Sequence, residues 1–137
     1  MTAVQPIHDP ATTIAGKPVP PPARARLQEA RALLTRHGIV AGPVVGLDAE
    51  VVRARLRERI RTRWPEGTAA CAFWLDDDEA ACFDRSGRLR QPLTIYVDGP
   101  ATAAAVTEAS RRAGLAAMPG QSPDSVLLTA GHEGAAA

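Results

Sequence analysis

Apolar residues recur at helical spacing in the first third of the chain. Four of them lie three or four positions apart, which places them on one side of a helix: Ala23, Leu27, Ala30 and Leu34. Pro22 suits a first helical turn, where a backbone amide has no partner to lose. Gly38 can end the helix because glycine adopts a left-handed conformation at low cost. The pattern therefore predicts a first helix between these two residues.

The stretch VVRARLRERIRTRW (51–64) has an arginine at every second position from its third residue onwards. Alternation of this kind is typical of a strand, but a strand this long would exceed the usual ~5 to 6 residues more than twofold and would bury Glu58. As a helix, the same stretch gathers its apolar residues into one stripe: Val52, Leu56, Ile60 and Trp64. With Asp48 as the N-cap, we predict a helix over about 49–64.

Short apolar runs separated by turn residues follow in the second half. AACAFWL (69–75) and AACF (80–83) predict two strands joined by a hairpin around DDDE, and LTIYVD (93–98) predicts a third strand. A helix over 101–113 and a strand over 125–130 come next. We expect this last strand to lie parallel to 93–98 through a right-handed crossover.

These elements predict an α+β fold with one folded domain. We expect a mixed sheet of about four strands, a meander plus one β-α-β crossover, covered on one face by two or three helices. The segments 40–47 and 116–124 are interpreted as connectors. The proline-rich residues 1–21 are expected to form a flexible arm, 22–131 the domain and 132–137 a disordered tail. The predicted core contains Leu27, Leu34, Leu56, Ile60, Trp64, Phe73, Leu75, Leu93, Ile95, Val97, Val126 and Leu128.

Length and charge bound the function. A chain of 137 residues can fold as one domain without disulfides or metals. Its formal net charge of +1, from 16 basic and 15 acidic residues, argues against a surface that binds polyanions throughout, so a basic function would be local. Nearly all positive charge is arginine, with Lys17 the one lysine, which fits a bacterial-type, GC-rich coding sequence.

The sequence also bears on location. The first ten residues lack the basic start and apolar core of a secretory signal, and no apolar run approaches the length of a membrane span. We therefore expect a soluble, cytoplasmic protein that does not contact membranes, with Cys71 and Cys82 as reduced thiols.

On a helix, the six arginines of 51–64 divide between two flanks of the apolar stripe. One flank carries Arg53, Arg57 and Arg61, and the other carries Arg55, Arg59 and Arg63. Arginine stems often cover the edges of an apolar stripe while their guanidinium groups stay in water. We therefore favour a solvated helix that pairs in part with a partner. The alternative is a helix that contacts nucleic-acid phosphates, with these candidate residues: Arg53, Arg57, Arg59, Arg61 and Arg63.

Four consecutive acidic residues occupy the tip of the predicted hairpin: Asp76, Asp77, Asp78 and Glu79. Their charge is opposite to that of the arginine helix, so we expect them either to pair with it or to bind a protein partner. Consecutive carboxylates cannot all face one ion, and two cysteines do not complete a tetrahedral zinc site. We therefore predict no metal site and no cofactor.

No nucleophile, base and orienting group form a recognisable set, so no catalytic residue is predicted. We expect a small non-catalytic binding or accessory protein that acts through protein–protein contacts, and the sequence does not identify the partner. Nucleic-acid association through the arginine helix is the first alternative. The second alternative is a small enzyme with an acidic site, with or without a metal, built from Asp76, Asp78, Asp84 and Asp98.

Overall fold

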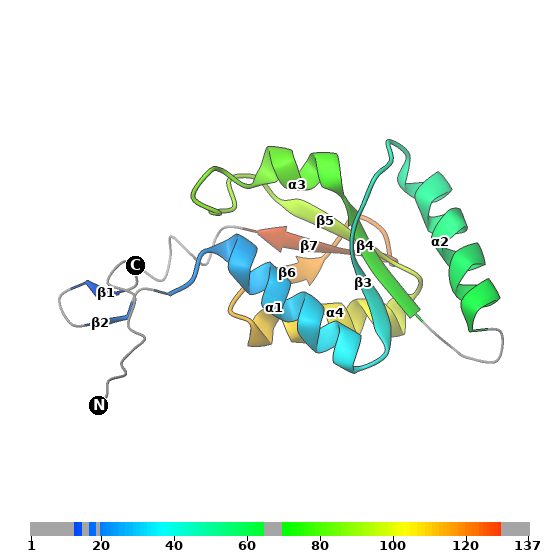
Figure 1. Cartoon of the computed structure of the whole chain (residues 1–137), viewed down its shortest axis with the longest axis horizontal. Coiled ribbons are helices and arrows are strands. Elements are labelled where there is room, and N and C mark those ends of the chain that lie inside the picture. The colour runs from blue at the N-terminus through cyan, green and yellow to red at the C-terminus, as the bar shows by residue number, and fades with distance from the viewer. Residues whose placement is uncertain (1–12, 15–16, 19, 65–69, 130–137) are drawn as a thin grey trace, which may run out of the picture.

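The chain has an α+β fold. The structure, a computed structural model, describes residues 13–14, 17–18, 20–64 and 70–129. In these residues a five-stranded mixed sheet, which is not closed, has the strand order β3-β4-β5-β7-β6 and is packed with four helices (Figure 1). Two short strands, β1 (Thr13–Ile14) and β2 (Lys17–Pro18), pair with each other and are not part of this sheet.

The bounds of the elements follow the chain. The helices are α1 (Ala23–Arg36), α2 (Ala49–Arg63), α3 (Asp76–Cys82) and α4 (Pro100–Arg112). The strands of the sheet are β3 (Ile39–Val44), β4 (Ala70–Leu75), β5 (Leu93–Val97), β6 (Ala116–Pro119) and β7 (Ser125–Thr129).

The two helices predicted in the first half are confirmed. α1 ends before Gly38, whose φ of 81° is the left-handed conformation that was expected. α2 begins after Asp48, whose side chain accepts hydrogen bonds from the amides of Glu50 and Val51. The alternating arginines therefore lie on a helix and do not form one face of a strand.

Helices cover both faces of the sheet, so the expectation of a single covered face is wrong. α1 and α4 pack on the face that carries Trp74 of β4, and they enclose the larger core. α2 packs on the opposite face against Phe73 and Leu75, the alternate residues of the same strand. Trp64, expected in the core, lies at the end of α2 with 44% of its surface exposed.

Two segments predicted as connectors contain strands: β3 (Ile39–Val44) covers the first part of 40–47, and β6 (Ala116–Pro119) covers the first part of 116–124. Pro43 and Pro119 suggested breaks in regular structure, but both strands lie at the edges of the sheet, where a missing amide is tolerated. An arginine from the covering helices binds each edge. Arg31 Nε donates to Ala41 O at 2.8 Å and Arg111 Nη2 donates to Ala117 O at 3.1 Å.

The prediction of a hairpin over 69–75 and 80–83 is wrong, because its second strand does not form. The predicted meander, which depended on that hairpin, is therefore wrong too. Residues 76–82 form α3, which follows β4 directly. Four acidic side chains in the first turn suit the positive end of a helix dipole, so the same residues that resembled a wet hairpin tip favour a helix start. After α3, a turn with Gly87 at φ 84° brings Phe83 into a single bridge with Leu89.

The β-α-β crossover lies elsewhere than predicted. β3 and β4 are parallel and are joined through α2, whereas β7 is antiparallel to β5. α4 leads from β5 to β6, and β6 is also antiparallel to β7. β5 and β6 therefore run in the same direction with β7 inserted between them. The predicted arm and tail lie largely outside the described residues, and 132–137 lie entirely outside them.

Candidate interaction surface

Arg53 of α2, a candidate for nucleic-acid contact, is buried on the side of the helix that faces the sheet, with 4% of its surface exposed. Its Nη1 lies 2.7 Å from Glu50 Oε2 and 3.1 Å from Asp124 Oδ2, and its guanidinium carbon is 5.9 Å from the centre of the Tyr96 ring. These contacts join α2 to β5 and to the turn before β7. Arg53 therefore belongs to the interior and not to a surface that meets a phosphate.

Arg57 and Arg61 lie on the same flank and also have internal partners. Arg57 Nη2 donates to Asp98 O at 3.4 Å, and Arg61 Nη1 pairs with Glu58 Oε1 at 2.9 Å. The structure thus does not bring the five candidates Arg53, Arg57, Arg59, Arg61 and Arg63 into one surface.

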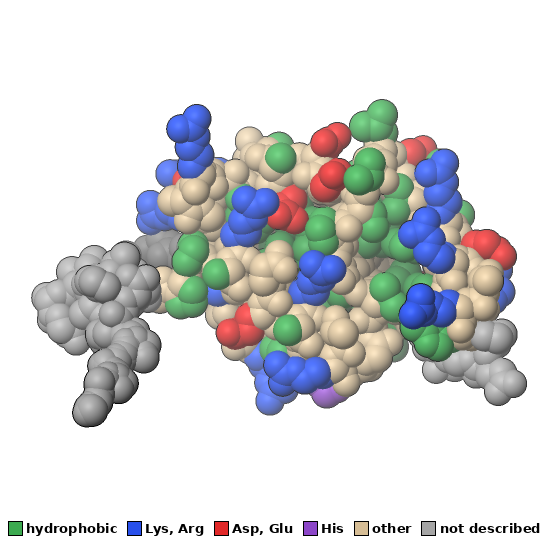
Figure 2. All heavy atoms as spheres, viewed as in Figure 1, with side chains coloured by type: hydrophobic (Ala, Val, Ile, Leu, Met, Phe, Trp, Pro, Cys, Tyr) green, Lys and Arg blue, Asp and Glu red, His purple; other side chains and the backbone are tan. Residues whose placement is uncertain are grey.

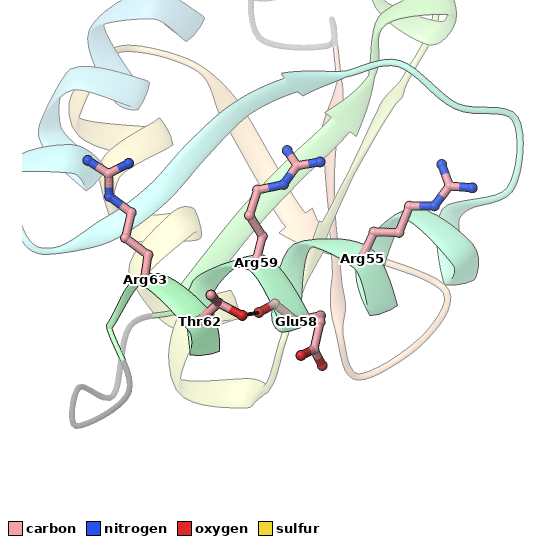
Figure 3. Close-up of a pocket in the computed structure, with 5 residues that line it drawn as sticks. All are labelled: Arg55, Glu58, Arg59, Thr62 and Arg63. Atoms are coloured by element: carbon pink, nitrogen blue, oxygen red, sulfur yellow. Dashed lines mark hydrogen bonds between the residues drawn. The ribbon is translucent and has the colours of Figure 1, made fainter.

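The other flank forms what we call the arginine row: Arg55, Arg59 and Arg63. These side chains leave α2 on the same side with their guanidinium groups directed alike (Figure 3). Each step of four residues is a rise of about 6 Å. The row lines an open groove of about 530 Å³ together with Glu58 and Thr62.

The three side chains of the arginine row are exposed. Among the residues that the structure describes, none forms an ion pair or a hydrogen bond with these three guanidinium groups. Glu58 turns its carboxylate toward Arg61 instead, and Thr62 donates to the backbone of Glu58. Arg63 packs over the exposed Trp64 ring at 5.2 Å, which adds an aromatic surface at the end of the row.

Exposed apolar side chains adjoin the row at the start of α2. We call them the apolar tip: Val45, 81% exposed, Leu47, 90%, and Val51, 45%. Val45 and Leu47 belong to the connection from β3 to α2, and Val51 lies one helical turn before Arg55. Figure 2 shows apolar side chains protruding at this end, with basic side chains along α2 beside them. An aliphatic side chain nearly fully in water is a feature of interaction sites when it is grouped with others.

The acidic candidates separate into two groups. Asp76 and Asp77 are exposed and Asp78 is half-buried in the first turn of α3, and we call these three the acidic turn. Glu79 faces inward, where it accepts from Trp74 Nε1 at 2.6 Å and from Arg24 at 2.7 Å. Glu79 therefore has a structural position, while the acidic turn remains on the surface.

The carboxylates considered for an enzyme do not share a site. Asp76 follows the end of β4, whereas Asp98 binds the amide of Cys71 at the start of that strand. Asp84 lies in the turn after α3 and accepts hydrogen bonds from Ser86 and Arg90. Within the described ranges no three His, Cys, Asp or Glu residues are close enough to hold a metal ion.

Cys71 and Cys82 are buried, free thiols, and they lie on β4 and at the end of α3 respectively. Burial, with a contribution from the charge of Asp98, raises the pKa of Cys71 to about 11. Burial also raises the pKa of Cys82. A raised pKa disfavours the thiolate, so neither side chain has the character of a nucleophile.

The apolar tip was missed from the sequence, and Arg55 was omitted from the list of candidate residues. The available signal was the four-residue spacing that continues from Leu47 through Val51, Arg55 and Arg59 to Arg63. That spacing defines a second, outward stripe of α2.

The chain was compared with protein-family models, curated proteins and solved structures, and none of the three comparisons found a match. Among the described residues, no helix has both the length and the apolar character that crossing a membrane requires.

Proposed function

We propose that this protein is a non-catalytic binding or accessory protein that recognises a protein partner through the apolar tip and the arginine row. The observation that carries the proposal is their continuity: the exposed aliphatic residues of the β3–α2 connection and of the first turn of α2 are followed, on the same side of the helix, by three arginines that have no ion-pair partner among the described residues. Arginine and tryptophan are among the residues that contribute most at the centres of protein interfaces, and the buried core of an interface is more apolar than the rest of the protein surface.

The partner surface has a definite chemistry under this proposal. An apolar patch would cover Leu47, and acidic side chains beside that patch would meet the arginine row. Trp64, stacked with Arg63, would cover the far end of the contact. The cytoplasmic location and the participation of Asp76, Asp77 and Asp78 in partner binding stay predictions.

Nucleic acid is the second candidate, because three arginines at one-turn intervals, without ion-pair partners in the described part of the chain, could contact successive phosphates. It is less well supported. Phosphates gain nothing from the apolar tip, and the acidic turn next to it would repel them. The buried Arg53 further reduces the basic area that α2 offers.

A photo-crosslinking amino acid at position 51 tests the proposal in the organism's own extract. We expect protein adducts, identified by mass spectrometry, that are lost when Arg55→Glu and Arg59→Glu are introduced together. The same amino acid at Arg85, an exposed residue of the turn after α3, is the control position. Identical adducts from both positions, or adducts with nucleic acid alone, would overturn protein recognition by this surface.

A further inference from the structure

The acidic turn lies directly beside the apolar tip. Val44 and Leu75 are partners in the parallel pair of β3 and β4, so the next residues, Val45 and Asp76, leave neighbouring strands about 4.8 Å apart. Figure 2 shows acidic side chains on the α3 side of the apolar tip and, on its α2 side, basic side chains with some acidic ones among them. The acidic residues of α2 have partners within that helix, since Asp48 caps it, Glu50 pairs with Arg53 and Glu58 pairs with Arg61. One surface therefore has three zones in sequence: acidic, apolar and basic.

Both charged zones are available to a partner. Asp76 and Asp77 form no ion pair or side-chain hydrogen bond with any residue in the described part of the chain, and the same holds for the arginine row. The apolar tip separates the two zones, so they do not neutralise each other within one molecule. An external surface that matches both zones must place basic groups against the acidic turn and acidic groups against the arginine row.

We infer that the surface binds a second copy of this chain in a two-fold symmetric dimer, an inference that rests on the protein-binding function proposed above. A two-fold axis through the apolar tip rotates the acidic turn of one copy onto the arginine row of the other, and the reverse contact forms by symmetry. The two apolar tips then cover each other. Leu47 and Val45, the most exposed large apolar residues described, lose contact with water in this arrangement.

A second copy fits this surface better than a polyanion does. A polyanion would complement the arginine row but would meet repulsion at Asp76 and Asp77. A uniformly acidic protein would meet the same repulsion. The order of the zones thus selects a partner that carries both signs of charge around an apolar centre, and the chain itself presents that arrangement.

Sedimentation velocity on the full-length chain tests the dimer at low salt. The wild type is expected to dimerise in the micromolar range, with a dissociation constant that rises with salt because the paired charges are partly exposed. Arg59→Asp and Asp77→Arg each place like charges opposite one another, twice per dimer. Each variant is expected to raise the dissociation constant about tenfold or more.

The decisive result is that dimerisation recovers when the two charge reversals are combined. An equimolar mixture of Arg59→Asp with Asp77→Arg regains opposite charges at both contacts, as does a chain that carries both substitutions, and both samples should dimerise like the wild type. Arg85→Asp and Glu29→Arg make matched charge changes at exposed residues elsewhere and should leave dimerisation unchanged. Urea midpoints equal to that of the wild type, measured at protein concentrations where all the chains are monomeric, show that the variants fold.

Three results would overturn the dimer. They are a wild type that stays monomeric up to millimolar concentration, a dimer that neither charge reversal weakens, and a mixture that fails to recover. A monomeric wild type that still forms adducts with another protein at position 51 would refute the self-association and leave the proposed function intact. Crosslinks from position 51 to a second copy of the chain that are lost in Arg59→Asp support both the dimer and the proposed function.

Discussion

The indole nitrogen of Trp74 donates a 2.6 Å hydrogen bond to Oε1 of Glu79, five residues further along the chain. The second carboxylate oxygen of Glu79 accepts from Nε and Nη2 of Arg24 at 3.0 and 2.7 Å. Glu79 therefore joins β4, α3 and the first turn of α1. Because both donors are aligned on one buried carboxylate, α3 is fixed to the sheet through its least exposed acidic residue.

Removal of that carboxylate should destabilise the fold. We expect Glu79→Ala to lower the free energy of unfolding by about 2–3 kcal/mol, since Trp74 Nε1 would stay buried without an acceptor. Glu79→Gln keeps an acceptor oxygen and should cost less. Arg24→Ala serves as the comparison and should cost about 1 kcal/mol or less, because Arg24 is half exposed. Urea unfolding measures the free energy of unfolding of all three variants. Equal losses of stability in Glu79→Ala and Glu79→Gln would contradict this role of Glu79.

Arg53 and Arg55 are separated by one residue on α2 but should respond differently to truncation. Arg53→Ala removes the buried link to Glu50 and Asp124 and should lower the free energy of unfolding by about 2 kcal/mol. Arg53 Nε has no acceptor among the described residues, which limits the net stabilisation. Arg55→Ala should change stability by about 0.5 kcal/mol or less. Similar losses in the two variants would show that the burial of Arg53 does not matter energetically.

Stability should decline in acid through Asp84. Hydrogen bonds from the Ser86 hydroxyl, the Arg88 amide and the Arg90 guanidinium lower the pKa of this carboxyl well below its ordinary value. The unfolded chain then binds a proton more readily than the folded one, so this stabilisation is present above about pH 4 and is lost as the pH falls below it. Asp84→Asn should be less stable than the wild type near neutrality, and the difference should vanish in strong acid.

Urea midpoints measured across this pH range test the role of Asp84. Glu29→Gln, which removes an exposed carboxylate without a described hydrogen bond, is the control and should leave the neutral stability within about 0.5 kcal/mol. A constant difference between Asp84→Asn and the wild type at every pH would contradict the linkage.

The native thiols should resist alkylation. Both cysteines are buried and have a raised pKa, so iodoacetamide should modify the folded protein at least about a hundredfold more slowly than a free thiol. Both should react fully in urea. Ala54→Cys, which places a thiol on the exposed side of α2, is the positive control. Rapid modification of Cys71 in the folded chain, detected by mass spectrometry, would show that this core opens readily.

The elements that the sequence predicted well are those in which the spacing of apolar residues and the residues at the ends indicate the same structure. α1 and α2 combine an apolar stripe with recognisable ends, at Gly38 and Asp48, and β5 combines β-branched and aromatic residues with polar flanks. β3 and β6 were missed because Pro43 and Pro119 indicate breaks unless the strand is known to be at an edge. Edge position depends on the order of the strands, which no local pattern contains.

The candidate surface was predictable only in part. The division of the arginines into two flanks followed from helical geometry, and the structure keeps Arg55, Arg59 and Arg63 together on one of them. The burial of Arg53 was not predictable, because its partner Asp124 is supplied by a turn 71 residues later. The neighbouring position of the acidic turn and the apolar tip likewise depends on the register of β3 with β4.

The two edge strands of the sheet limit how the protein can assemble. At β3 and at β6, an arginine occupies an outward carbonyl and a proline removes an amide, so an incoming strand finds the ladder interrupted on either side. Fibrillar growth by strand addition is thereby discouraged. Copies that associate must then meet through side chains, and a two-fold contact of the kind inferred above closes at two molecules.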